Sequence, residues 1–238
     1  MVDILSPAVP SRIALPLIRT IQSNYKTIWQ TPASSAPTAK GVERKYFAPS
    51  KGYEFLFCHP SPCSLVVSTV NEREHHGQQA PAPEAKEAKR LGLFGRKVYS
   101  SGGLQLSIAN QQGILNRHNF NSWEAVGKFK DNLRQSSQQE FMALVDEGKA
   151  VAKTSLQASL DSADAAARTI TSGVVMRCSA WLQESGLLPE VQITLQDLPF
   201  EGSGLFSDQT DTRLHSFKDS RATLKSLGMR PGDPEEAL

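Results

Sequence analysis

The longest helical pattern in this 238-residue chain runs from Gln138 to Ser185 and reads QQEFMALVDEGKAVAKTSLQASLDSADAAARTITSGVVMRCSAWLQES. It contains no proline, since none occurs between Pro83 and Pro189. Small or apolar residues recur along it with a mean step of about 3.6 residues, the period of an α-helix. Because a strict heptad repeat has a step of roughly 3.5, the pattern predicts a nearly straight helix pair. This stripe comprises Phe141, Val145, Gly148, Ala152, Leu156, Leu160, Ala163, Ala167, Ile170, Val174, Cys178 and Trp181.

Both ends of the pattern carry the signals of a helix boundary. Ser136 followed by Gln139 resembles a capping box. Gly186 suits the left-handed residue after a helix, and Pro189 suits the first turn of the next one. We therefore predict one continuous helix over Gln138–Ser185. A helix of this length more often offers a surface to another chain than performs chemistry, so we expect an interaction protein and no enzymatic activity.

The composition narrows the class of protein further. The net charge of +2 gives no general case for nucleic-acid binding, and three cysteines are too few, and odd in number, for a disulfide framework. They are typical of a reducing compartment. No apolar run approaches the roughly 20 residues that cross a bilayer, and the N-terminal region lacks the pattern of a secretory signal. We expect a soluble intracellular chain that does not enter a membrane.

Shorter patterns on either side of the long helix predict further helices. Apolar residues recur every three or four positions from Ile13 to Ile28, and Ser64 is placed to cap a short helix through Val70. A helix over Gln105–Arg117 is expected to be loosened at its start by Gly102 and Gly103. Three more helices are expected: one opened by Asn121, one by Pro189, and a last one by Asp208 or Thr210.

These elements define the expected fold class and domains. The fold class is mainly α, an extended helical bundle around one long coiled-coil-like helix, with a partly disordered N-terminal third. Residues 1–90 form an N-terminal segment of short helices that ends in a polar linker, His75–Ala88, expected to be disordered. Residues 91–228 form a helical dimerisation domain, and residues 229–238 form a disordered tail.

The motifs that would carry chemistry are weak. Cys58, His59, Cys63, His75 and His76 are the one cluster of metal-ligand types, but Pro60 and Pro62 interrupt the cysteine pair, which favours ordinary loop residues. Neither a Walker A motif nor a dinucleotide-binding glycine motif occurs. Gly202-Ser203-Gly204 reads as a turn rather than a nucleophile elbow. We therefore predict no catalytic residue, no metal ligand and no cofactor.

Three further features have a structural and a functional interpretation. The basic residues between Lys86 and Lys97 read as a solvated segment, with a nuclear-import patch or contacts to phosphates as the alternatives. Cys178 lies on the apolar stripe and is interpreted as a small buried side chain rather than a reactive thiol. Trp181, at the end of the stripe, is either a contact for a partner or part of the core.

Three segments carry a family resemblance. They are Leu93–Ser101 (LFGRKVYSS), the helix through Thr154–Leu182, and Leu198–Gly202 (LPFEG) followed by Leu205-Phe206. Together they resemble the gag-like protein of DIRS-type retrotransposons. The same segments resemble, in the same order, the C-terminal domain specific to the alpha isoform of lamina-associated polypeptide 2. The likeness extends over roughly Ile28–Gly228.

The resemblance implies a nearly all-helical homodimer built on a long coiled-coil-like helix. On the lamina side it implies a nucleoplasmic protein that binds an A-type lamin or the retinoblastoma protein. The LEM domain of that family, which binds a chromatin linker protein, has no counterpart in this sequence. On the retrotransposon side it implies a structural protein that assembles and packages RNA, with a cytoplasmic location as the alternative.

Two sets of residues are the candidate sites. A lone helix cannot bury both sides of the apolar stripe, so its central part is the expected self-association face. The last segments are expected to pack on the end of the long helix, where an exposed apolar cluster would form a partner patch. The self-association face consists of Leu156, Leu160, Ala163, Ala167, Ile170 and Val174. The partner patch consists of Trp181, Leu182, Phe200, Leu205 and Phe206.

From the sequence we predict that Leu160→Asp lowers the oligomer mass. The substitution places a charge in the middle of the expected self-association face, where it would lose its water. Sedimentation velocity measures the mass, and circular dichroism reports whether helicity is kept. An unchanged mass with wild-type helicity would contradict a self-association face that includes Leu160.

Overall fold

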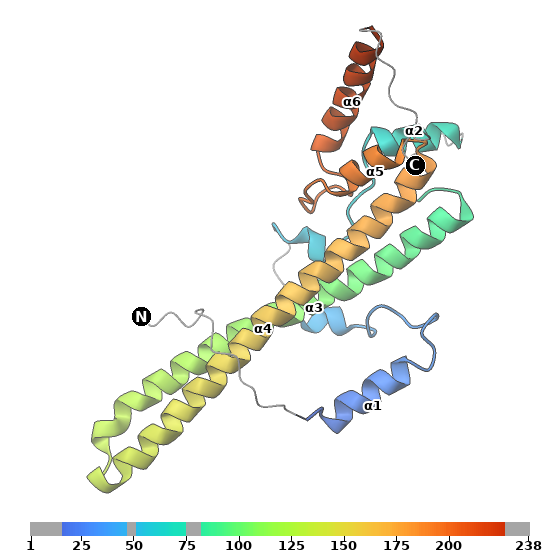
Figure 1. Ribbon diagram of the computed structural model, residues 1–238. Coiled ribbons are helices and arrows are strands. Elements are labelled where there is room, and N and C mark those ends of the chain that lie inside the picture. Colours follow the sequence, from blue (N-terminus) through green and yellow to red (C-terminus); the bar gives the residue numbers. More distant parts are fainter. Residues whose placement is uncertain (1–15, 47–50, 75–81, 227–238) are drawn as a thin grey trace, which may run out of the picture. The chain divides into compact units, whose positions relative to one another are not determined.

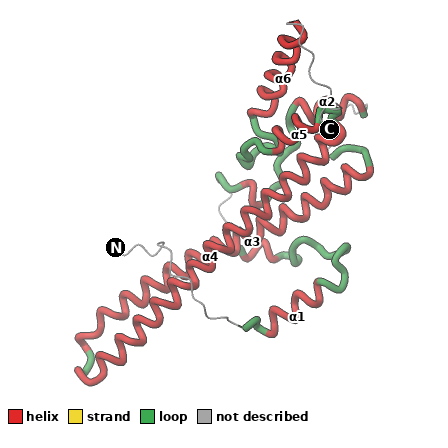
Figure 2. The backbone as a smooth tube through the Cα atoms, in the orientation of Figure 1, coloured by secondary structure: helices red, strands yellow, loops and turns green. Residues whose placement is uncertain are grey.

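The computed structural model describes residues 16–46, 51–74 and 82–226, with the backbone alone for 220–226. The described residues form helices and connecting loops and no named strand, which confirms the predicted α class (Figure 2). Along the chain the elements are α1 (Arg19–Ile28), η1 (Val42–Lys45), η2 (Glu54–Leu56), α2 (Leu65–Arg73), α3 (Lys86–Gly127), η3 (Lys128–Asn132), α4 (Gln135–Glu184), α5 (Pro189–Gln196) and α6 (Gln209–Ser226), of which η1 to η3 are short 3-10 helices.

Helix α4 confirms the prediction of one continuous helix from its sequence pattern. It has 50 residues and includes all of the predicted range except Ser185. Gly186 follows it with a left-handed φ of 69°. Ser185 completes the end of the helix, because its hydroxyl donates to the Leu182 carbonyl at 2.6 Å and accepts from the Leu187 N–H at 3.2 Å. Pro189 stands in the first turn of α5, as expected.

Helix α3 differs from the expectation of two shorter helices. It runs for 42 residues through Gly102 and Gly103 and through Asn121 without a break. It also begins inside the expected linker, since residues 86–88 are helical, whereas residues 75–81 and the tail 229–238 lie outside the described residues. The capping-box pattern at Asn121 therefore does not open a helix here.

The reason for this continuity is the close packing of α3 against α4 (Figure 1). A Cβ atom added at Gly102 would lie 2.8 Å from the Ile170 Cγ1 and 3.1 Å from the Ala166 carbonyl oxygen. A Cβ atom added at Gly127 would lie 3.3 Å from Val145. Residues later in α3 thus contact residues earlier in α4, so the two helices are antiparallel. Glycine weakens an isolated helix, but here the missing side chain lets a neighbouring helix approach.

The residues of α4 that face α3 lie one position away from part of the predicted stripe. Ser159 and Ala166 are buried, whereas Leu160 is 40% exposed and Ala167 is also exposed. Ser159 fits the interface because its hydroxyl accepts from the Asn116 side-chain amide at 3.1 Å. Small residues fill the contact at Ser159 and Ala166, and larger ones such as Ile170 pack where α3 has a glycine.

The described residues fall into two compact units, each with segments from both long helices. Unit 1 contains the residues up to Leu56 together with Ser100–Ile170, and unit 2 contains Phe57–Tyr99 together with the chain from Thr171 onward. This grouping by contacts differs from the sequential division at residue 90. A long helical hairpin contacts different partners at its two ends, so a boundary in space crosses each helix rather than a loop.

Unit 1 holds the η3 end of the helical hairpin and the α1 region. The segment before α2 contacts α3 closely, since a Cβ atom added at Gly103 would lie 3.1 Å from the Leu56 carbonyl oxygen. The Ser101 hydroxyl donates to the Pro37 carbonyl at 2.8 Å. Further along the hairpin, the Trp123 ring packs directly over Gly148.

Unit 2 surrounds the other ends of α3 and α4 with α2, α5 and α6. Ser64 caps α2 as predicted, accepting from the Val67 N–H at 3.4 Å. Asp211 on α6 accepts from the Leu65 N–H at 2.9 Å and so links α6 to the start of α2. A second link joins two loops, because the Leu205 N–H donates to the Ser61 carbonyl at 2.8 Å.

We predict that alanine has opposite effects at Gly173 and Gly113. A Cβ atom at Gly173 would lie 2.8 Å from both the Gly95 carbonyl oxygen and the Tyr99 nitrogen, so Gly173→Ala should destabilise the fold by about 1–3 kcal/mol. At Gly113 the nearest atoms are 3.9 Å away, so Gly113→Ala should stabilise it by about 0.5–1 kcal/mol through helix propensity. Urea denaturation measures both; stabilisation by both substitutions would contradict the close packing.

Candidate functional site

The predicted self-association residues do not form one surface. Leu156, Ile170 and Val174 are buried within the chain, with exposed fractions of 4%, 5% and 7%. Leu160 and Ala167 are exposed, and Ala163 is intermediate. The first three therefore act as core, and Leu160 is the one large side chain of the six that is exposed to a second molecule.

A different set of apolar residues is exposed on the hairpin of unit 1. Leu144, Val151 and Ala158 are exposed and recur every seven residues along α4, which places them on nearly one line. Ala158 and Leu115 of α3 line the same groove, which has a volume of about 400 Å³. Leu115, Leu144 and Val151 are each more than half exposed. We call Leu115, Leu144, Val151 and Ala158 the hairpin face.

The hairpin face was present in the sequence pattern but was not recognised there. The residues of the face on α4 recur every seven positions, next to the predicted apolar stripe whose mean step is about 3.6 residues. Leucine and valine at such positions are also typical of a core. Residue size does not separate the two sets, because the contact with α3 buries Val145, Leu156 and Ile170 while Ala158 is exposed. The direction of each side chain relative to α3 decides which set it belongs to, and the sequence pattern alone does not give that direction.

The predicted partner patch is mostly core of unit 2. Trp181, Leu182, Leu205 and Phe206 have exposed fractions of 4% or less. Phe200 is intermediate, and its ring meets Tyr99 edge-on with a centroid distance of 6.4 Å. The buried residues hold the fold together and are not available to a partner in this arrangement.

Cys178 holds the loop of Leu205 against α4. Its thiol donates to the Leu205 carbonyl oxygen at 3.3 Å and is 5% exposed, which confirms the interpretation as a buried side chain. Burial raises the pKa of the Cys178 thiol to about 12, although the nearby Arg177 charge acts in the opposite direction. The thiol is therefore neutral throughout the physiological pH range, and its nucleophilic thiolate form is rare.

The segment around Cys58 and His59 packs near Tyr99 of α3. The rings of His59 and Tyr99 have centroids 5.6 Å apart, and the His59 Nε2 lies 3.2 Å from the Arg96 carbonyl oxygen. Desolvation lowers the pKa of His59, and the charges of Arg177 and Arg96 lower it further, which outweighs the hydrogen bond to the carbonyl. Burial raises the pKa of Tyr99 to about 12.

The structure gives no metal-ligand cluster in the part of the chain that it describes. Cys58 and Cys63 are exposed free thiols, and no group of three or more His, Cys, Asp or Glu residues there could hold a metal ion. His75 and His76 lie outside the described residues. Among the described helices, none is both long and apolar enough to span a bilayer.

Comparison with known proteins leaves the chain without an assigned relative. No protein-family profile, no curated protein and no solved structure matches it.

We predict that the three cysteines react with iodoacetamide in two classes. At pH 8 the native chain should take up two adducts quickly, at Cys58 and Cys63, because both thiols are exposed. Cys178 should react only after unfolding in urea, because it is buried and its pKa lies near 12. Mass spectrometry of tryptic peptides assigns each adduct. Rapid native modification of Cys178 would show that the Leu205 loop does not cover it.

Proposed function

We propose that this chain is a non-enzymatic, self-associating helical scaffold for protein interactions, similar in role to the C-terminal domain of lamina-associated polypeptide 2 alpha. The observation that carries the proposal is the hairpin face of unit 1. It presents three large apolar side chains to solvent along two packed helices. Single exposed apolar residues are common on protein surfaces, but several aligned ones are typical of an interaction surface.

The geometry of a helical bundle explains why a second copy fits this face. An antiparallel hairpin buries one side of each helix and leaves the flanks of the contact open. Two such hairpins cover each other's flanks in a four-helix bundle, where residues at a spacing of seven interlock. In a two-fold symmetric dimer the same face is used by both copies, so every apolar residue contributes twice.

The energetics agree with a dimer of moderate affinity. Full burial of one large aliphatic side chain contributes about 1.5–3 kcal/mol, and the three large residues of the face are already partly covered. Counted in both copies, these six side chains contribute roughly 5–9 kcal/mol, which exceeds the minimum cost of association of about 4 kcal/mol. Burial of Ala158 and of the aliphatic parts of neighbouring side chains adds to this gain.

The two flanks of α4 can be tested separately. Leu160 follows Val151 by nine residues, which is two and a half turns, so the two side chains lie on opposite flanks of the contact with α3. Both are exposed, with fractions of 40% and 56%. We assign the interface to the flank of Val151, because Leu144, Ala158 and Leu115 extend it along both helices.

The family resemblance supports the choice of partners and compartment. On this basis we propose a nucleoplasmic location and an A-type lamin or the retinoblastoma protein as the partner. The gag-like alternative predicts RNA packaging and a cytoplasmic location instead. Capture of purified A-type lamin by the immobilised chain supports the lamina reading, whereas a mobility shift with single-stranded RNA at physiological salt supports the gag reading.

We predict that Val151→Asp converts the self-associated chain into a monomer. The carboxylate would be placed in the centre of the apolar interface and would lose its water without gaining a partner. Analytical ultracentrifugation should show the mass fall to that of one chain, while circular dichroism shows unchanged helicity because Val151 faces solvent within the chain.

Ala150→Asp is the matched control for this experiment. Ala150 is exposed on the side of α4 that points away from α3, so the same charge there should leave the mass unchanged. If Leu160→Asp lowers the mass and Val151→Asp does not, the interface lies on the flank predicted from the sequence. A wild-type chain that sediments as a monomer at high micromolar concentration would refute self-association.

A further inference from the structure

Helix α1 of unit 1 carries an apolar face that is open to solvent. Ile21, Tyr25 and Ile28 follow each other at steps of four and three residues, so they lie on one side of the helix. Ile18 and Trp29 extend this side at the two ends of α1. Tyr25 is half-buried, and each of the other four side chains is more than half exposed. We call these five residues the α1 face.

Exposure sets α1 apart from the other described α-helices. It contains no buried residue, whereas α2 to α6 each contain at least one. An amphipathic helix in a protein is normally stabilised because its apolar face packs on a core, and a helix of 10 residues is marginal in water without such packing. The α1 face is therefore available to a binding partner.

The charges around α1 favour a negatively charged surface as this partner. Residues 4–42 contain no Asp or Glu, and their basic residues are Arg12, Arg19, Lys26 and Lys40. Arg19 and Lys26 are seven residues apart, which places them on one line on the polar side of α1. Cations beside an apolar helix face are the pattern of a helix that lies in the headgroup region of an anionic bilayer.

The side chains of the α1 face suit a lipid surface better than a groove in a protein. A helix that packs on another helix needs matching gaps, such as those that Gly95 and Gly173 provide where α3 meets α4. The α1 face has only β-branched and aromatic side chains, around which lipid chains can rearrange. The rings of Tyr25 and Trp29 lie side by side, with centroids 4.4 Å apart. Tyrosine and tryptophan prefer the boundary between headgroups and acyl chains.

We propose that α1 binds the surface of an anionic lipid bilayer, a function beyond that of the scaffold. The helix lies parallel to the membrane, and the α1 face enters the boundary between the headgroups and the acyl chains. Arg19 and Lys26 extend to the lipid phosphates while their aliphatic parts lie along the apolar boundary. Ser23 and Thr27, on the polar side, remain in water.

Surface binding requires no spanning segment. The expectation of a chain without a membrane partner rests on the absence of an apolar run long enough to cross a bilayer, and none of the described helices could span one. A helix in the interface needs only one apolar face. The sequence pattern from Ile13 to Ile28 predicts a helix, but only the tertiary structure shows that α1 packs on no core.

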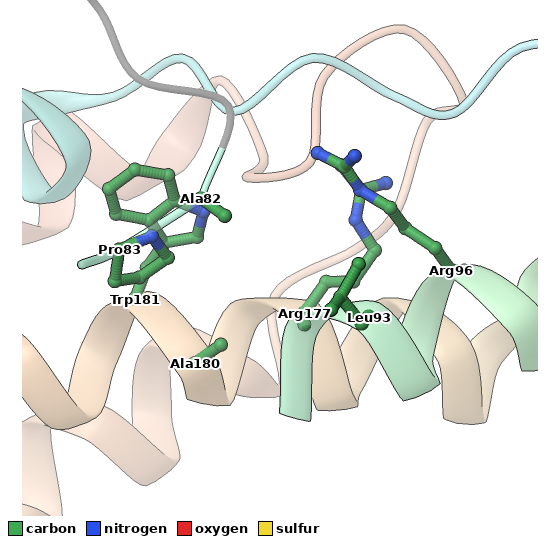
Figure 3. A pocket seen from close by; sticks show the side chains of 8 residues that line it. Ala82, Pro83, Leu93, Arg96, Arg177, Ala180 and Trp181 are labelled. Carbon is green, nitrogen blue, oxygen red and sulfur yellow. The ribbon is translucent and has the colours of Figure 1, made fainter. Parts of the chain in front are cut away.

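Trp29 provides a direct readout of the proposed contact. Its exposed fraction, 67%, is the largest among the large apolar side chains of the described residues. Trp181 is 2% exposed and lines a small cavity together with Pro83 (Figure 3). Trp123 packs over Gly148. A shift of the tryptophan emission to shorter wavelength on addition of vesicles therefore reports that Trp29 has left water.

The proposal is tested by titrating the whole chain with vesicles of phosphatidylcholine and phosphatidylserine in a ratio of about three to one. The emission shift should saturate, and the chain should co-sediment with the vesicles. Ile21→Gln should weaken binding about tenfold or more, because it removes a large side chain from the middle of the α1 face. Ser23→Gln is the matched control on the polar side and should bind as the wild type does. Both variants should keep the wild-type thermal midpoint, because both positions are exposed.

A charge variant and a second vesicle complete the test. Lys26→Gln should weaken binding about fivefold, whereas Lys89→Gln, at an exposed position of α3, changes the net charge equally and should not. Vesicles of phosphatidylcholine alone should bind the wild type about tenfold more weakly or less. No binding by the wild type, equal binding of the two vesicle types, or equal binding of the wild type and Ile21→Gln would overturn the proposal. A lower oligomer mass of Ile21→Gln in sedimentation velocity without lipid would also overturn it, since the α1 face would then contact a second copy.

Discussion

The close approach of α3 and α4 is the contact on which the rest of this structure depends. Glycines make it possible: Gly95 and Gly173 stand against each other's backbone in unit 2, and Gly102 leaves space for Ile170 in unit 1. Each glycine lowers the intrinsic helix propensity of its segment. The helices persist because backbone-to-backbone packing over so many turns outweighs that cost, as tertiary contacts generally do for helices in proteins.

This contact also determines where the large side chains go. The glycines of α3 leave room for Val145, Leu156 and Ile170 of α4 in the contact, whereas Leu144, Val151 and Leu160 stand on its flanks in unit 1. They remain exposed there unless another molecule covers them. Self-association through the hairpin face is the outcome expected of such a hairpin, and the same reasoning explains why Leu160 is exposed although its spacing places it near the buried stripe.

In unit 2 the end of α4 acts as a platform for loops that are distant in the sequence. Arg177 binds the Pro60 carbonyl, Cys178 binds the Leu205 carbonyl, and the Leu205 N–H binds the Ser61 carbonyl. These hydrogen bonds satisfy backbone groups of irregular segments that sheet or helix partners would otherwise satisfy. The burial of the Arg177 guanidinium is the cost of this arrangement.

The amino-acid sequence by itself determined the α class, the extent of α4, the cap at Ser64, the start of α5 at Pro189 and the burial of Cys178, because each rests on local chemistry or on a long periodic pattern. Tertiary structure alone decided that α3 passes unbroken through Gly102 and Asn121, that Ser159 rather than Leu160 faces α3, and that Arg96 lies beside Arg177. Local rules assign glycine to helix ends and large apolar residues to a core. Both assignments reverse where two backbones come close, because the space at such a contact is set by the partner helix and not by the residue's own neighbours in the sequence.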